Sequence, residues 1–162
     1  MFDIEINNQQ STMNIDKGIL EARLVQTLQA EHVAGASLSV AIVTDEAIHA
    51  VNRDHLGHDY ATDVISFLYS DDAPDPGSDS TAPRGAGKVI DGELVVSAET
   101  AVREARRFGW QPQDELSLYL VHGLLHLCGY DDLTEEELPL MRQREREILQ
   151  IWGLTPHYEE AV

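Results

Sequence analysis

The sequence predicts an α+β domain in which about five helices pack on a small mixed sheet of about four strands. Four short segments are rich in alternating or continuous apolar residues, as in strands, and longer segments between them carry apolar residues at helical spacing. The length of 162 residues and the apolar share of 43% are enough for one hydrophobic core. We therefore expect a single domain over residues 1–162.

The first half of the chain is expected to form two strands and two helices. Residues 2–6 alternate apolar and polar side chains, which is typical of a half-buried strand, and residues 38–43 form a second strand. Residues 15–32 carry apolar side chains on one helical stripe, which indicates an amphipathic helix. Thr44 is a suitable N-cap for a short helix that ends near residues 53–55, because the acidic residues after it suit the helix dipole.

The middle of the chain is expected to form two further strands around a loop. Residues 62–68 are the third strand, and residues 90–97 the fourth, in which a continuous apolar stretch indicates burial. Between them, residues 70–88 are rich in Asp, Pro, Gly and Ser, which predicts a mobile acidic surface loop. A solvated excursion is the simpler interpretation of this loop, and folding over a substrate is the alternative.

The last part of the chain is expected to be helical. Ser97 can cap a helix over residues 98–108, and a second helix follows over residues 113–128. The final helix begins either at Thr134, which opens a capping-box sequence, or at Pro139, because proline is favoured in a first helical turn.

Two histidines in the helix over residues 113–128 predict a metal site. His122 and His126 lie four residues apart, so their imidazoles share one face of a helix and can hold one ion. Gly129 can end the helix, and Asp132 can then offer a carboxylate oxygen to the same ion. Two nitrogens, one oxygen and a fourth position for water are the pattern of a catalytic zinc. Such histidine spacing also occurs by chance, but the glycine and the acidic residue after it favour a metal site.

Composition limits the environment and the partners. The start of the chain lacks the basic and then apolar stretch of a signal peptide, and no apolar run approaches the ~20 residues of a membrane span. The single Cys128 excludes an internal disulfide; it points away from the histidine face, so we expect a buried thiol rather than a ligand. We expect a cytoplasmic protein without a membrane partner.

The charge argues against general nucleic-acid binding. With 11 Lys and Arg against 29 Asp and Glu, the formal net charge is −18, and the protein is on average repelled by phosphates. An RNA-binding role must therefore rest on the metal or on a local basic patch. Three arginines in residues 98–108 and three in residues 142–146 are candidates, although their alternation with glutamates is also typical of solvated helix faces.

The histidine segment also carries a family resemblance. Residues 122–131, His-Gly-Leu-Leu-His-Leu-Cys-Gly-Tyr-Asp, resemble the HGxLHLxGYDH signature of the YbeY family of bacterial rRNA maturation endoribonucleases. Residues 62–67 resemble the family's TDVLSF stretch ten residues after Asn52, and residues 92–97 resemble its GDIVIS strand. The resemblance implies a zincin-like fold with one zinc ion per chain and a single-strand-specific endoribonuclease. It also implies action on the 3′ end of small-subunit rRNA and in ribosome quality control, with single-stranded rRNA and the small ribosomal subunit as partners and no DNA.

Two positions depart from the family pattern. Asp132 stands where the family has its third histidine, and Asp131 is an alternative ligand. Leu56 stands where the family has an arginine that would suit an anionic phosphate. His55 and His58 flank this position and are candidates for substrate contact, although surface histidines of a polar loop are the simpler interpretation.

The resemblance also makes Asp63 and Ser97 candidates for lining the active site. Without it, both are ordinary strand and cap residues, and a structural hydrogen bond is an equally good explanation of Asp63.

Three functions compete on this evidence. The interpretation that we favour is a zinc-dependent RNA phosphodiesterase in which His122, His126 and Asp132 hold the ion and act through its bound water. A peptidase is the second, because the histidine spacing matches the metzincin pattern, but Gly123 replaces the glutamate that serves as its general base. The third is a ribosome-binding protein with a structural metal and weak catalysis.

Overall fold

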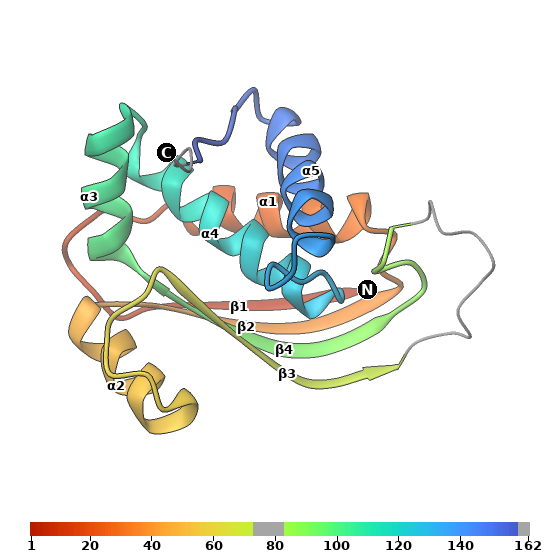
Figure 1. Cartoon of the computed structure of the whole chain (residues 1–162), viewed down its shortest axis with the longest axis horizontal. Coiled ribbons are helices and arrows are strands. Elements are labelled where there is room, and N and C mark those ends of the chain that lie inside the picture. Colours follow the sequence, from red (N-terminus) through yellow and green to blue (C-terminus); the bar gives the residue numbers. More distant parts are fainter. Residues whose placement is uncertain (73–82, 159–162) are drawn as a thin grey trace.

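The structure, a computed structural model, describes residues 1–72 and 83–158 (Figure 1). Its strands are β1 (Phe2–Asn8), β2 (Gly35–Val43), β3 (Val64–Asp72) and β4 (Val89–Ser97). Its helices are α1 (Lys17–Ala30), α2 (Asp45–Leu56), α3 (Ala98–Phe108), α4 (Pro112–Leu127) and α5 (Glu137–Gln150). The strands form one mixed sheet in the order β1-β2-β4-β3, in which only β3 is antiparallel to its neighbour. The predicted α+β domain with five helices and a mixed sheet of four strands is confirmed.

The helices cover the two faces of the sheet unequally. Helices α1, α3, α4 and α5 lie on one side, whereas α2 lies on the other (Figure 1). The continuous apolar stretch of β4 serves both faces, since Leu94 and Val96 belong to the larger core and Val95 to the smaller core against α2. The run predicted to be buried is therefore buried on both faces, as expected for a central strand.

The loop that the sequence predicts over residues 70–88 begins later in the structure. Strand β3 continues to Asp72, and its last residues pair with the beginning of β4, so the segment 70–72 is part of the sheet. Residues 73–82 lie outside the described residues. The segment 83–88 forms a turn that is held in place, because the backbone N–H of Gly87 donates to the carbonyl of His32 at 2.9 Å. Alternation of polar and apolar residues could not reveal these pairings, which depend on neighbouring strands.

Helix α5 begins at Glu137, between the two starts that the sequence suggested. The hydroxyl of Thr134 accepts a hydrogen bond from the N–H of Glu137 at 3.1 Å, and Pro139 lies in the first turn, where a helix needs no N–H donor. In the part of the chain that the structure describes, none of the helices is long and apolar enough to cross a membrane.

Helix α4 lies unusually close to the sheet at Gly123. A Cβ atom there would be 2.9 Å from Cδ2 of Leu94 and 3.0 Å from both Cγ2 of Val64 and Oγ of Ser66. The Ser66 hydroxyl donates to the Gly123 carbonyl at 3.0 Å, which ties the helix to β3. Position 123 therefore faces the sheet, and its missing side chain sets the distance between the helix and the sheet.

Replacing Gly123 with alanine is expected to lower the free energy of unfolding by about 1–3 kcal/mol, because the methyl group must displace packed side chains or lift α4. Gly18→Ala in α1 is the matched control, since a Cβ there would meet only Oδ1 of Asp16, at 3.4 Å. It should leave the stability unchanged or raise it by up to about 1 kcal/mol. Urea unfolding followed by circular dichroism measures both, and equal stability of Gly123→Ala and the wild type would contradict the close packing.

Candidate metal centre

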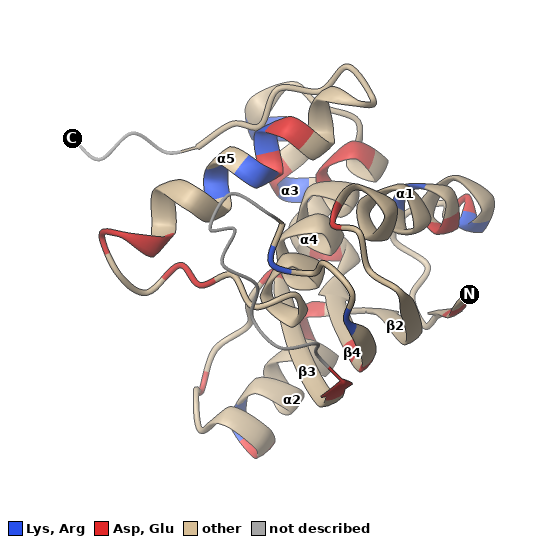
Figure 2. Ribbon diagram, turned by 90° about the vertical axis from the view of Figure 1, so that its right-hand side faces the viewer, with Lys and Arg blue, Asp and Glu red and all other residues tan. Residues whose placement is uncertain are grey.

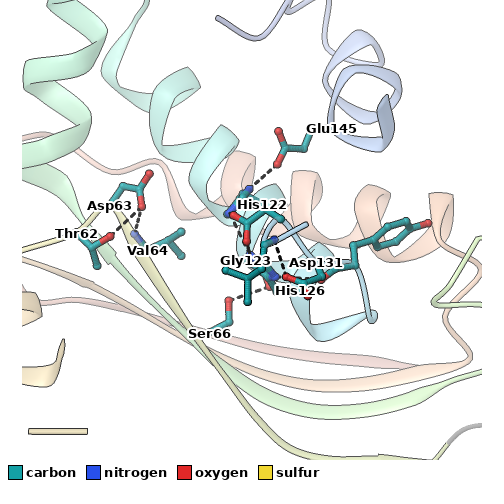
Figure 3. Close-up of polar contacts among 12 residues, drawn as sticks. Thr62, Asp63, Val64, Ser66, His122, Gly123, His126, Asp131 and Glu145 are labelled. Carbon is teal, nitrogen blue, oxygen red and sulfur yellow. Dashed lines mark hydrogen bonds and ion pairs between the residues drawn. The ribbon is translucent and has the colours of Figure 1, made fainter. Parts of the chain in front are cut away.

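Two histidine side chains interrupt the buried part of helix α4. From Glu115 to Leu127 every residue is buried except His122 and His126, whose side chains are 28% and 29% exposed. The two imidazoles lie next to each other on one side of α4, as the four-residue spacing predicted (Figure 3). In this part of α4, these two imidazoles are therefore the side chains that can contact a metal ion or another ligand.

Three side-chain atoms converge at this face. The Nε2 atoms of His122 and His126 are 3.2 Å apart, and the carboxylate of Asp132 lies 3.4 Å from the first and 3.7 Å from the second. Zinc bonds of about 2.0–2.2 Å at tetrahedral angles place ligand atoms about 3.3–3.6 Å apart, so these spacings fit one small cation. The structure thus brings together the predicted group of His122, His126 and Asp132, which could hold a metal ion.

Hydrogen bonds orient both imidazoles so that their Nε2 atoms can bind a metal ion. Nδ1 of His126 lies 3.0 Å from the carbonyl oxygen of Tyr130, which can only accept, so this nitrogen carries the proton and Nε2 keeps its lone pair. Nδ1 of His122 donates in the same way to Oε1 of Glu145, at 2.5 Å. The Glu145 side chain is only 3% exposed, and its other oxygen accepts from the hydroxyl of Tyr158 at 2.5 Å. This arrangement of a metal-facing nitrogen and a buried partner for the other nitrogen is typical of metal-binding histidines.

The charges around His122 favour a cation. Burial lowers the pKa of its imidazole, but hydrogen bonds with Asp132 and Glu145 outweigh burial and raise that pKa to about 10. The hydrogen bond to His122 in turn lowers the pKa of Asp132. Two carboxylates beside one imidazole thus stabilise positive charge at this point, which either a proton or a metal ion can supply.

Asp132, rather than its neighbour Asp131, faces the histidines. Oδ1 of Asp131 accepts the backbone N–H of Leu133 at 3.0 Å and so shapes the turn after α4. The geometry therefore favours Asp132 of the two candidates. Cys128 is fully buried, as predicted, and burial raises the pKa of its thiol to about 12.

Two cavities flank the metal centre. One, of about 550 Å³, lies among α3, α4, α5 and the segment that contains His157 and Tyr158; we call it the α3–α5 cavity. The other, of about 440 Å³, lies among α2, β3 and α4, and we call it the α2–β3 cavity. They share four lining residues, Thr62, Asp63, His122 and Asp132. The ligand group is therefore open to solvent on two sides.

The other predicted site residues fall into two groups. Asp63 lines both cavities, and its carboxylate accepts the N–H of Val64 at 2.7 Å (Figure 3). Ser97 lines neither: it is buried, caps α3 and donates to Asp45 at 2.6 Å. His55 and His58 are exposed beside Phe67 and Tyr60 and are not among the cavity residues; His55 belongs to the last turn of α2 rather than to a loop. Leu56, between them, lines the α2–β3 cavity.

Sequence reasoning missed the residues that support the histidines. Glu145 had a signal: it stands four residues after Met141 and three before Ile148, so a charged residue lies on the buried stripe of α5. The carbonyl of Tyr130 and the hydroxyl of Tyr158 had none, because neither contact follows from a pattern in the sequence.

Comparison with known proteins identifies the family. The model of the family described as Endoribonuclease YbeY matches residues 5–153. The chain belongs to the YbeY family. Proteins named Endoribonuclease YbeY from Pelotomaculum thermopropionicum and Moorella thermoacetica are 36% and 38% identical to it, over 93% and 94% of this chain and 97% and 98% of theirs. The solution structure of TM1509 from Thermotoga maritima has the same fold, with a TM-score of 0.55, 22% identity and coverage of 94% of this chain and 91% of that one.

Membership in the YbeY family makes the chain an enzyme of the nuclease class, which hydrolyses phosphodiester bonds. The metal-site geometry is compatible with that chemistry, because a cation open to solvent can bind a phosphate oxygen.

Asp132→Asn is expected to reduce zinc affinity at least about tenfold, because an amide is a poor zinc ligand, whereas Asp131→Asn should change it less than twofold. Titration with zinc against a competing chelator measures both affinities. The opposite ranking of the two variants would show that Asp131 is the ligand.

Glu145→Gln is expected to weaken zinc binding about 10- to 100-fold, because an amide supports the Nδ1–H of His122 less strongly than a carboxylate. Glu147→Gln is the matched control on the same helix, since Glu147 is 47% exposed and pairs with Arg144 instead. Isothermal titration calorimetry with zinc compares them. Equal affinities for the two variants would remove Glu145 from the support of the site.

Proposed function

We propose that this protein is a zinc-dependent, single-strand-specific endoribonuclease that processes the 3′ end of small-subunit rRNA and takes part in ribosome quality control. His122, His126 and Asp132 hold one zinc ion, and the small ribosomal subunit presents the RNA in the cytoplasm. The observation that carries the proposal is a three-ligand group that is open to two cavities in a chain of the YbeY family. Open coordination is the mark of a catalytic site rather than of a structural one.

The residues present have the chemistry that such a reaction needs. When bound, zinc supplies Lewis acidity, which activates water near neutral pH and stabilises negative charge on a phosphoryl oxygen. His122 and His126 present their lone pairs because Glu145 and the Tyr130 carbonyl hold the opposite nitrogens. The chain thereby fixes the direction of both ligands before substrate arrives.

Asp63 is the best candidate for moving a proton during the reaction. Five carboxylates line the two cavities, and four of them are engaged by histidines, by Tyr158 or by Arg107: Glu104, Glu115, Asp132 and Glu145. The carboxylate of Asp63 instead contacts the adjacent backbone N–H of Val64 and the hydroxyl of Thr62. It therefore lies beside the metal ligands without a charged partner of its own among the described residues.

The peptidase alternative is weakened by the position of Gly123. In the metzincin pattern this residue is the glutamate that serves as general base. Here it faces Val64, Ser66 and Leu94 at contact distance, so a side chain at this position would meet the sheet instead of the metal centre.

Metal analysis combined with an RNA cleavage assay tests the proposed function. Purified wild-type protein should contain about one zinc per chain and cleave single-stranded RNA, whereas His122→Ala should lose most of the metal and the cleavage, because it removes one of three ligands. His49→Ala, a surface histidine that pairs with Asp59, is the control and should behave as the wild type.

Three outcomes would contradict the proposal. Equal metal in the wild type and His122→Ala would refute the ligand assignment. Chelator-sensitive turnover of casein without RNA cleavage would indicate a peptidase. Co-sedimentation with the small ribosomal subunit, combined with RNA that stays intact after long incubation, would indicate a binding protein with a structural metal.

A further inference from the structure

The two cavities beside the metal centre differ in charge. Among the described residues that line it, the α2–β3 cavity has neither lysine nor arginine, and Leu56 lies in its wall. The α3–α5 cavity has Arg103 and Arg107 on α3 and Arg142 on α5. Figure 2 shows these basic segments of α3 and α5 on the same part of the molecule. Positive charge from the protein is thus available on one side of the metal centre.

The three arginines are not equally available to a ligand. Arg103 pairs with Asp45 at 2.6 Å, and Arg107 pairs with Glu104 at 3.6 Å. None of the ion pairs among the described residues involves Arg142, whose guanidinium lies over the ring of Tyr158 at 4.7 Å from its centroid. A guanidinium stacked on a ring keeps its N–H donors at the edge, where they can bind a phosphate.

Most carboxylates of the α3–α5 cavity already have a charged or histidine partner; among the described lining residues the exception is Asp63, which contacts only the Val64 N–H and the Thr62 hydroxyl. Glu115 pairs with His157 at 2.5 Å, and Glu145 pairs with His122 at the same distance. Asp132 faces both histidines and, with them, the metal position. Among the described residues, Arg142 is therefore the arginine of this cavity without a carboxylate partner, and together with a bound divalent cation it would attract an entering anion.

The same cavity offers little to recognise a base. The ring of Phe108 is stacked on His157 at 3.7 Å, and the ring of Tyr158 is covered by Arg142. Two aromatic faces that could have stacked on a nucleobase are thus already occupied. A volume of about 550 Å³ is in the range of pockets that hold a small ligand such as one nucleotide.

We propose that the α3–α5 cavity binds the phosphate of the nucleotide next to the scissile bond, with Arg142 as its main contact and without base specificity. This inference rests on the proposed RNA cleavage and adds the path that the RNA strand takes across the protein. The strand runs from the metal centre towards α3 and α5, away from the α2–β3 cavity, which has neither lysine nor arginine among its described lining residues. Arg142 supplies the neutralisation of the phosphate on this side of the metal centre.

Paired arginine variants test this inference. Arg146→Gln is the matched control for Arg142→Gln: Arg146 lies one turn further along α5 and 5.3 Å from the same Tyr158 ring, but does not line the cavity. The probe is a fluorescein-labelled single-stranded RNA octamer, read by fluorescence anisotropy on zinc-loaded protein and checked on a gel for cleavage. Arg142→Gln should bind it about 5- to 10-fold more weakly, with a salt slope lower by about 0.7, and Arg146→Gln should stay within twofold of the wild type.

A competition experiment separates phosphate from base recognition. AMP should displace the probe from the wild type and from Arg146→Gln, adenosine should not, and Arg142→Gln should need about tenfold more AMP. Zinc content and the thermal midpoint, measured for each variant, should match the wild type, which shows that the metal centre and the fold are intact.

The contrary outcomes are distinct. Equal loss of affinity in both variants, or displacement by adenosine as readily as by AMP, would overturn the phosphate site. Unchanged binding by Arg142→Gln in a preparation that cleaves RNA would overturn it while leaving the proposed function standing. A zinc-loaded wild type that neither binds nor cleaves single-stranded RNA would overturn both.

Discussion

Helix α4 can lie directly on the sheet because glycines stand at its points of contact. Gly123 on the helix and Gly92 on β4 both occupy positions where a Cβ would come within 2.9 Å of another atom, and for Gly92 this includes the side chain of Leu127. Close packing buries most of α4 and leaves the side chains of His122 and His126 partly accessible to solvent. This packing explains where the candidate metal centre lies, because the two histidines occupy the one accessible stripe of α4. It also leaves no room for a glutamate at position 123, next to His122.

The turn that leads to Asp132, the candidate third ligand, is anchored by buried hydrogen bonds. Tyr130 is buried; its carbonyl accepts from His126, and its hydroxyl donates to the buried carboxylate of Glu31 at 3.1 Å. Glu31 also accepts from Arg144 of α5 at 2.8 Å, and Lys88 donates to the carbonyl of Cys128 at 2.9 Å at the end of α4. The turn that carries Asp132 is thereby fixed to the end of α1, to α5 and to the segment before β4. A buried carboxylate that lost these partners would destabilise the fold strongly, so the same contacts serve stability and ligand geometry.

The sequence was most informative where the determinants are local. The spacing of His122 and His126 and the following glycine depend only on helix geometry, which is why the metal-binding face could be predicted and its convergence with Asp132 anticipated. Ser97 was harder to interpret, because a cap and an active-site serine look alike until its bond to Asp45 is known. The order of the strands and the contact of Glu145 with a histidine 23 residues away depend on tertiary packing. In the sequence, such contacts can be recognised only indirectly, for example from a charged residue on the buried stripe of a helix.

The charge of the molecule then has a clear consequence for RNA. Six of the 11 Lys and Arg residues lie in α3 and α5, whereas the protein as a whole carries a formal charge of −18. Long-range attraction cannot bring a polyanion to this surface, so binding must depend on short-range contacts made at the site itself. A divalent cation held by Asp132 and the histidines would offset the acidic side chains around it and would thereby add to substrate binding as well as to chemistry. Of the two cavities beside the candidate metal centre, only the α3–α5 cavity has arginines among its described lining residues, so a strand that reaches this centre can be neutralised by lining side chains on that side.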